Sequence, residues 1–398
     1  MKDKGGQMNR IYITIMALLV LLTHGGVWAD EPKLPLINSN DSIEFGQHKL
    51  INVKSYGAKG DGITDDTDAI NTALKKGGIV YFPDGVYMIK TANNESNEYG
   101  HYGEGIQPVS NSMLLFSGKA KLKAIPNQAK RYSVIRIHDV DNIIIKGAII
   151  EGDRSTEDGA HGMGIDIRNS RNISIDSCKI FNCLGDGIDA SSYEADKLGK
   201  SICHNISIIN TEIFNCRRQG ITLGGVQNAI IQNCNIHDMY GVNPQSGIDI
   251  ETNYPAVTIN DDIKIENTIF SNNANYDIVI APTKGKNIQI NKVNASKLFI
   301  NGGIIKLYSC NITNGFITAA SKAEKLVIYN TVCHNTENQF YVPTEIYNSQ
   351  FINKNYEPKV GAVINTWSTL KFVDSIVKSE KSSKLLIRKL KGKITNRK

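Results

Sequence analysis

The sequence predicts an all-β solenoid, in which short parallel strands stack coil upon coil behind a short N-terminal capping helix. The main observation is a motif that recurs through most of the chain: an Asn followed by alternating apolar residues. This alternation is typical of a strand with one buried face. Successive copies start 23 to 34 residues apart, the length of one solenoid coil; they begin at Asn142, Asn172, Asn205, Asn228, Asp262 and Asn287.

The same repeat predicts what lies at the corners and inside each coil. Ile and Val dominate the inward positions, as stacked parallel strands prefer. An Asn at the same corner of each coil predicts a ladder of side-chain amides that satisfies turn backbone.

A helix over residues 64–76 is expected to cover the open N-terminal end of the solenoid. Thr64 and the acids after it suit a helix N-terminus, Ile70 and Leu74 supply an apolar face, and Gly77–Gly78 suit its end. A cap of this kind shields core and strand edges that would otherwise favour aggregation.

The ends of the chain predict an exported protein. Residues 1–29 have a basic start, an apolar run from Ile11 to Leu22 and a small-x-small site ending at Ala29, the pattern of a cleaved signal peptide. We expect a linker over 30–50, the solenoid over 51–377 and a solvated basic tail over 378–398. Localisation would be secreted or periplasmic, without stable membrane insertion after cleavage.

The charge distribution excludes a nucleic-acid-binding fold. The net charge of +6 comes from the two ends, because the tail over 378–398 holds nine Lys or Arg and one Glu. The segment 30–377 is left mildly acidic.

The seven cysteines contain no CxxC pair, so no structural zinc site is expected. Cys183 and Cys216 each lie eleven residues after a motif Asn and should be neighbours on adjacent coils. Both a disulfide and a pair of stacked thiols are compatible with that spacing.

A closer resemblance is carried by the opening of the predicted domain. The segment from Ile51 to Ile70, INVKSYGAKGDGITDDTDAI, and the segment from Gly78 to Tyr87, GIVYFPDGVY, closely resemble the start of pectate-lyase-like superfamily proteins. With the coil repeats, the resemblance covers roughly residues 50–350. It implies a single-stranded right-handed parallel β-helix, and it indicates the fold more than the reaction.

Four segments align as one strand on successive coils, and they supply the candidate site. They are Gly164-Ile-Asp-Ile, Gly187-Ile-Asp-Ala, Gly220-Ile-Thr-Leu and Gly247-Ile-Asp-Ile. Period two turns the Ile residues inward and makes an outward column of Asp166, Asp189, Thr222 and Asp249. The preceding glycines are expected to form a second outward column, open to a ligand.

Stacked acids of this kind need compensation. Asp166 and Asp189 would be about 5 Å apart on adjacent coils. Such a pair must share a proton, bind a cation or hold a basic partner.

We predict that Asp189 and Asp249 are the catalytic pair, with Asp166 and Asp186 tuning them. Two carboxyl groups flanking a bond are what glycoside hydrolysis requires, and two coils give nearly the separation of an inverting enzyme. The expected substrate-binding residues flank this pair; they are Arg218, which could hold a substrate carboxylate, Gln219, Glu251, His161 and Tyr254.

The segment from Gly185 to Asp189 resembles the central acidic strand of polygalacturonases, but an adjacent Asp-Asp pair and later Gly-His-Gly and Arg-Ile-Lys motifs are missing. The segments RQGI (218–221) and QSGIDIE (245–251) look instead like those of uncharacterised bacterial β-helix proteins of this superfamily, which are related to polygalacturonases and rhamnogalacturonases. We therefore expect a glycoside hydrolase, monomeric and free of cofactor, that degrades an acidic polysaccharide.

Two alternatives stay open. One is a lyase or epimerase in which the acids bind Ca²⁺ and Arg218 or a nearby base removes a proton. The other is a non-catalytic carbohydrate-binding surface protein.

Overall fold

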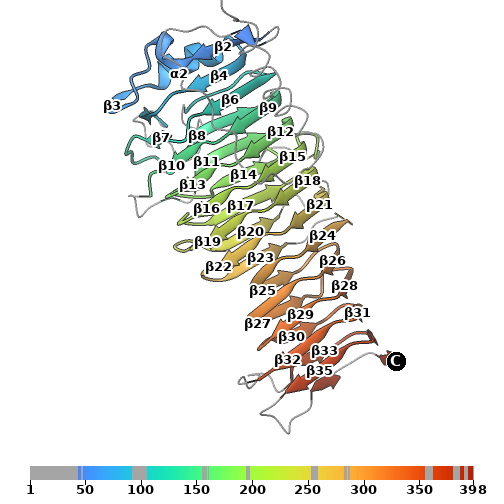
Figure 1. Cartoon of the computed structure of the whole chain (residues 1–398). Coiled ribbons are helices and arrows are strands. Elements are labelled where there is room, and N and C mark those ends of the chain that lie inside the picture. The colour runs from blue at the N-terminus through green and yellow to red at the C-terminus, as the bar shows by residue number, and fades with distance from the viewer. Residues whose placement is uncertain are drawn as a thin grey trace, which may run out of the picture.

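The chain winds into a right-handed parallel β-helix, an elongated stack of coils that follows the chain from its N-terminal to its C-terminal end (Figure 1). The computed structural model describes residues 44–45, 48–91, 105–154, 159, 161–193, 198–251, 259–281, 285, 287–354, 362–379, 386–389 and 393–397. Within them the architecture is nearly all-β, with one α-helix and one short 3-10 helix. The predicted fold class is confirmed.

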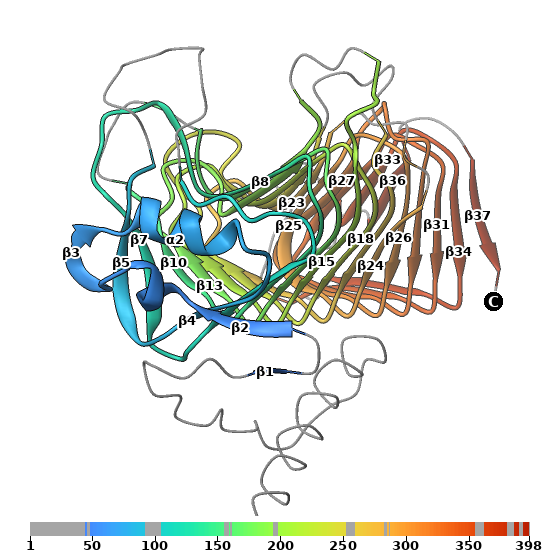
Figure 2. The same cartoon turned by 90° about the horizontal axis from the view of Figure 1, so that it is seen from above.

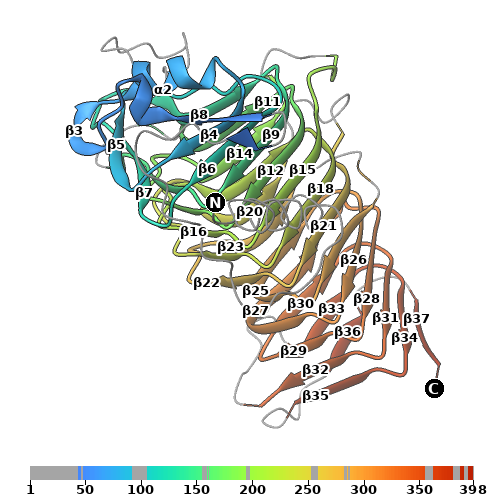
Figure 3. The ribbon, with the colours of Figure 1, turned by 45° about the horizontal axis from the view of Figure 1, so that its top comes forward.

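Each coil contributes to three faces. The first face is a 15-stranded sheet, which Figure 3 shows running from β9 to β37. Its strands are β1 (Glu44–Phe45), β2 (His48–Asn52), β4 (Gly78–Phe82), β6 (Ser112–Phe116), β9 (Asp141–Lys146), β12 (Arg171–Asp176), β15 (Cys203–Ile209), β18 (Val226–Gln232), β21 (Asp261–Glu266), β24 (Ile288–Asn291), β26 (Ile304–Tyr308), β28 (Lys325–Tyr329), β31 (Thr344–Tyr347), β34 (Leu370–Val373) and β37 (Ile394–Arg397).

The second face is made of mostly short strands. They are β3 (Asp61–Asp65), β5 (Gly85–Ile89), β7 (Ala120–Ala124), β10 (Ile149–Glu151), β13 (Lys179–Phe181), β16 (Glu212–Phe214), β19 (Asn235–His237), β22 (Ile269–Ser271), β29 (Val332–His334), β32 (Gln350–Asn353) and β35 (Ile376–Ser379).

The third face carries the candidate site. Its strands are β8 (Arg131–His138), β11 (His161–Arg168), β14 (Ile188–Ser191), β17 (Gln219–Gly224), β20 (Ser246–Ile250), β23 (Tyr276–Ile280), β30 (Glu337–Phe340), β33 (Ile364–Thr366) and β36 (Ile387–Lys389). Two longer strands, β25 (Asn294–Ile300) and β27 (Asn311–Ala319), turn the corner and belong to both the second and third faces.

The corner between the third and the first face is held by the predicted amide ladder. Asn172 donates to Asn142 over 2.8 Å, and Asn205 donates to Asn172 over 2.7 Å. These residues have positive φ, between 57° and 62°. Asn tolerates this left-handed conformation better than other side chains, which explains its recurrence at this corner.

The N-terminal end is covered by α2 (Thr67–Leu74), which Figure 2 shows in front of the stacked coils. Ile70 and Leu74 are buried in the core. The helix is shorter than the expected 64–76, because residues 61–65 form β3 instead. The Asp61 carboxylate accepts hydrogen bonds from the backbone of Ile63 and Thr64, which holds this segment in a turn outside the helix.

Both expected domain boundaries need correction. Strand β2 starts at His48 and pairs with β4, inside the segment 30–50 expected as a linker. Within 378–398, expected as a solvated tail, β36 pairs with β33 and β37 pairs with β34. The expected signal peptide lies outside the described residues. In the described part of the chain, no helix has the length and hydropathy to cross a membrane.

Candidate active site

The register of the third face agrees with the prediction. Ile165, Ile188, Ile221 and Ile248 pair in sequence across β11, β14, β17 and β20, and all four are buried in the core. Asp166, Asp189, Thr222 and Asp249 pair one residue further along, on the outer side of the same strands. The four polar residues therefore form the predicted column.

The glycines that precede the four isoleucines do not form the expected outward column. A Cβ at Gly164 would lie 2.7 Å from Cγ2 of Ile180 in the core, and one at Gly247 would lie 2.6 Å from the ring of Phe270. The N–H groups of Gly164 and Ile165 both donate to the next coil, so the strand bends here instead of alternating. Glycine is needed because the bend presses the backbone against the core of the solenoid.

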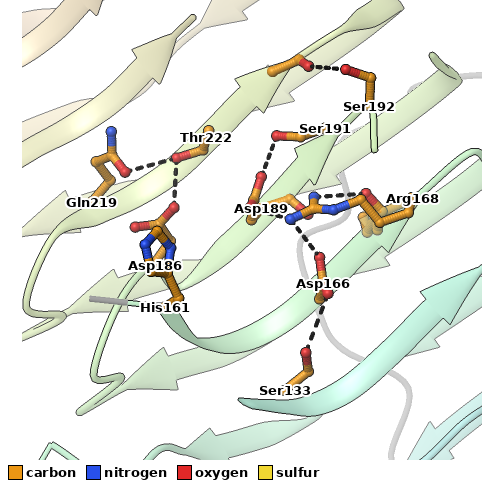
Figure 4. A network of polar contacts seen from close by, with 12 residues as sticks. Ser133, His161, Asp166, Arg168, Asp186, Asp189, Ser191, Ser192, Gln219 and Thr222 are labelled. Carbon is orange, nitrogen blue, oxygen red and sulfur yellow. Dashed lines mark hydrogen bonds and ion pairs between the residues drawn. The ribbon is translucent and has the colours of Figure 1, made fainter. Parts of the chain in front are cut away.

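The stacked pair Asp166 and Asp189 holds a basic partner, Arg168, which the sequence analysis missed (Figure 4). Its Nη2 atom lies 3.0 Å from Asp166 Oδ1 and 2.6 Å from Asp189 Oδ2. Arg168 follows Asp166 by two residues on the same strand, so period two places it on the same outer side. That spacing was the signal that could have revealed it.

Asp166 is the most strongly compensated acid of the group. Burial raises its pKa, but the charge of Arg168 and a hydrogen bond to His138 outweigh burial, so the net effect lowers it. His138 Nε2 lies 2.9 Å from Asp166 Oδ2, and Ser133 contributes a weaker bond of 3.3 Å. Asp166 therefore belongs to a closed ionic cluster with β8.

Asp186 precedes the bend before β14 and reaches toward the next coil. Its carboxyl lies 3.2 Å from Arg218 Nε and 2.7 Å from the Thr222 hydroxyl. Its side chain is fully buried. Burial, opposed by the charge of Arg218 and assisted by that of Asp189, raises its pKa to about 7.

The hydrogen-bond pattern also favours a protonated Asp186. Arg218 Nε can only donate, so the Gln219 atom 2.6 Å away is its carbonyl oxygen. The Thr222 hydroxyl lies 2.9 Å from that oxygen and 2.7 Å from Asp186 Oδ2, and its single proton can serve only one of these two contacts at a time. A proton on Asp186 lets both contacts form as hydrogen bonds.

Asp249 belongs to the same hydrogen-bond network, because Gln219 contacts both Arg218 and Asp249. Gln219 donates from Nε2 to Asp249 Oδ2 over 2.6 Å. Burial and the neighbouring charge of Glu251 raise the pKa of Asp249 well above its usual range. Its other oxygen, Oδ1, is buried without a hydrogen-bond partner among the described residues. Both features favour the neutral acid.

Of the residues expected to bind substrate, Arg218 and Gln219 are instead engaged with other side chains of the site. The guanidinium of Arg218 is already engaged by Asp186 and by Glu251 Oε1 at 3.2 Å, with His161 Nδ1 at 3.4 Å. Gln219 is fully buried and works within the network. The side chain of Glu251 is 38% exposed and is the most open of these acids. Tyr254 lies outside the described residues.

The acidic neighbours of Arg218 also bear on its chemistry. Burial lowers its pKa, but the charges of Asp186 and Glu251 outweigh burial and raise it overall. An arginine in this state holds its proton, so it is unsuited to act as the base that the lyase reading assigned to it. Among the described residues, no three His, Cys, Asp or Glu side chains are grouped so that they could hold a metal ion.

Cys183 and Cys216 are neighbours, as predicted. The pKa of the Cys183 thiol is raised by a hydrogen bond with Cys216 and by burial. All seven cysteines are buried free thiols.

A right-handed parallel β-helix with a column of buried carboxyl groups on one outer face defines the class of protein. A family model described as rhamnogalacturonase A/epimerase, pectate lyase-like, matches residues 50–268. The chain belongs to this family, and the match covers every acid of the candidate site.

Individual relatives extend the comparison. The uncharacterised Bacillus subtilis protein YclG is 31% identical over 224 residues, which cover 51% of this chain and 38% of YclG. The pre-neck appendage protein of Bacillus phage phi29 is 29% identical over 178 residues, 41% of this chain and 19% of that protein. The matches thus span well under two thirds of these relatives.

The fold also resembles solved structures. The A-module of the Azotobacter vinelandii mannuronan C-5 epimerase AlgE4 aligns with a TM-score of 0.57 at 15% identity, covering 86% of this chain and 99% of the module. At this identity the likeness concerns the fold.

Proposed function

We propose that the protein is a glycoside hydrolase that degrades an acidic polysaccharide, with Asp249 as general acid and Asp189 as general base. The observation that carries the proposal is the contrast between these two carboxyl groups. Asp249 has a raised pKa and one orphaned oxygen, whereas Asp189 is ion-paired with Arg168. Neighbouring carboxyl groups in opposed environments are how such enzymes separate acid from base.

The spacing of the pair indicates the stereochemistry. Asp189 and Asp249 lie two strands apart, separated by Thr222, which corresponds to roughly 9.6 Å between backbones. Inverting glycosidases keep about 6.5 to 9.5 Å between their carboxyl groups to admit a water. Side chains that lean toward one another would bring the pair into that range, so inversion is the expected outcome.

Asp186 and Glu251 assist in this scheme. Both contact Arg218, and Gln219 links Arg218 to Asp249. Asp249 gives up its proton most readily while Asp186 stays neutral, because a charged Asp186 would raise the pKa of Asp249.

One cation, Arg154, supports the proposed substrate class. Arg154 donates to the backbone carbonyls of Asn215 and Tyr240 and stacks on the Tyr240 ring, with Cζ 3.7 Å from the ring centroid. Bonds to carbonyls leave its positive charge available to an anionic sugar. We further propose a monomeric enzyme that is exported by its N-terminal segment and needs no cofactor; N-terminal sequencing of secreted protein tests the export.

The test is release of reducing ends from a panel of uronate-containing polysaccharides by wild type, Asp189→Asn and Asp249→Asn. Each substitution is expected to lower activity by about 10² to 10⁴, the usual contribution of acid–base catalysis. Proton NMR of the first product should show an inverted anomeric centre. Full activity in both variants would place the reaction elsewhere on the solenoid.

A lyase or epimerase is the second candidate, because the matched family model includes epimerases. An ultraviolet-absorbing product, or loss of wild-type activity with chelator alone, would establish it in place of the hydrolase. Binding of polysaccharide without any product would instead support a non-catalytic role.

A further inference from the structure

One outer column of the third face continues far beyond the acids. From Glu251 onward, each of its residues directly follows a third-face strand and donates its backbone N–H to the preceding coil. The bonds run from Glu251 to Leu223, Ala281 to Ile250, Asn301 to Ile280, Ala320 to Ile300, Tyr341 to Ala319 and Trp367 to Phe340. We call the six donors the C-terminal rail.

The column differs in exposure on the two sides of the site. On the N-terminal side its members Arg168, Ser191 and Gly224 are buried, and Arg168 is locked between two carboxylates. All six residues of the rail are half-buried or exposed. A polymer that contacts Glu251 therefore finds open outer surface toward the C-terminal end, along the axis of the stack.

The rail ends in a pair of stacked aromatic rings. The centroids of Tyr341 and Trp367 are 4.2 Å apart, and their planes differ by 9°. Tyr341 is 38% exposed. The residue of the rail on the preceding coil is Ala320, which is small. The ring face of Tyr341 that is turned away from Trp367 therefore has no large side chain of the rail beside it.

The pair combines an apolar surface with a polar neighbour. The Tyr341 hydroxyl donates to Gln339 Oε1 over 3.2 Å, and Gln339 lies on the outer side of β30. An aromatic face beside a hydroxyl and an amide suits a sugar ring, which has apolar C–H faces and a polar edge.

We propose that Tyr341 and Trp367 form a distal binding site for the polysaccharide, whose chain runs from the acids along the C-terminal rail. The inference rests on the proposed function and assigns the direction in which the substrate lies. Glu251 and Trp367 are five coils apart, roughly 24 Å at the usual strand spacing. A short oligosaccharide at the acids cannot reach the ring pair, whereas a long one engages both sites.

The experiment compares a trisaccharide with an octasaccharide of galacturonate, and of mannuronate, as probes for the full chain. Dissociation constants are measured for wild type, Tyr341→Ala and Trp367→Ala. Octasaccharide binding is expected to weaken about tenfold in either variant, or about 1.4 kcal/mol, with trisaccharide binding unchanged. The matched control is Tyr329→Ala, because Tyr329 stacks on Tyr308 and Tyr347 on the first face, away from the rail.

Unchanged octasaccharide affinity, equal losses for both lengths, or an equal loss in Tyr329→Ala would overturn the proposal. Trp367→Phe keeps a ring, so it should restore binding even if the alanine variant is unstable; a folded Trp367→Phe that binds no better than alanine also counts against it. The proposed function is tested separately, by the activity of Asp249→Asn. If that variant keeps full activity, the proposed function fails, and the distal site is still tested by the binding measurements.

Discussion

Replacing Arg168 by Met tests the electrostatic basis of the candidate site. The variant keeps most of the side-chain volume but leaves Asp166 and Asp189 stacked without their common partner. Two carboxylates about 5 Å apart on adjacent strands, at an effective dielectric constant near 20, repel by about 3 kcal/mol. Breaking a buried pair costs about 3 to 5 kcal/mol in general. We therefore expect a loss of about 3 kcal/mol in unfolding free energy at pH 7.

The loss should depend on pH in a defined direction. In the wild type the pKa of Asp166 is lowered, so its contribution to stability is present above the unfolded pKa and lost as pH falls through the folded one. In the variant the two stacked carboxylates repel each other without a common partner, and protonation of either one relieves the repulsion. The difference between the two proteins should be largest near neutral pH and shrink toward pH 4.

Urea unfolding midpoints from pH 4 to pH 8 measure this difference. Arg168→Lys is the control that keeps a positive charge, and Arg168→Met combined with Asp189→Asn should recover much of the loss. A variant as stable as wild type at pH 7, or a loss that does not change with pH, would refute the compensation by Arg168.

Three further predictions concern an acid, a ladder residue and a bend. Asp186 has a folded pKa of about 7, above its ordinary value, so wild-type stability should fall as pH rises from about 4 to about 7, and urea midpoints of Asp186→Asn should lack this decline. Asn172→Ala should lower the free energy of unfolding by about 1 to 3 kcal/mol, because alanine loses the amide hydrogen bonds and is strained at a positive φ. Asn172→Gly loses the same hydrogen bonds without the strain and should cost less, so equal melting temperatures of the two variants would contradict this. Gly187→Ala should lower the free energy of unfolding by about 1 to 3 kcal/mol, and the melting temperature with it, through a clash with Ile213; lost activity at an unchanged melting temperature would instead support an outward glycine.

Much of the fold could be predicted from the sequence, because a period-two pattern that repeats with every coil fixes both the strands and their register. The column from Asp166 to Asp249 followed directly, since its members flank the same inward isoleucines. The inward direction of Gly164 did not, because the bend at this residue, within β11, interrupts the alternation. Period two holds only where the backbone is extended.

The polar contacts of the site were harder to predict. The sequence places Arg218 between two acidic coils, but it does not show that Asp186 and Glu251 both contact its guanidinium. The strands β36 and β37 were missed because their basic composition resembles that of a solvated tail, whereas Ile387 and Ile394 sit in register with the coils before them.

The regular stacking of the third face has a consequence for how such a molecule can change its reach. Each coil adds one rung to the C-terminal rail, so the distance from Glu251 to the ring pair can only take values in steps of about 4.8 Å. Gain or loss of one whole coil between Ala281 and Ala320 would move the rings by one step and leave the chemistry at both ends intact. The number of coils between the two sites therefore sets the length of polymer that can contact both of them.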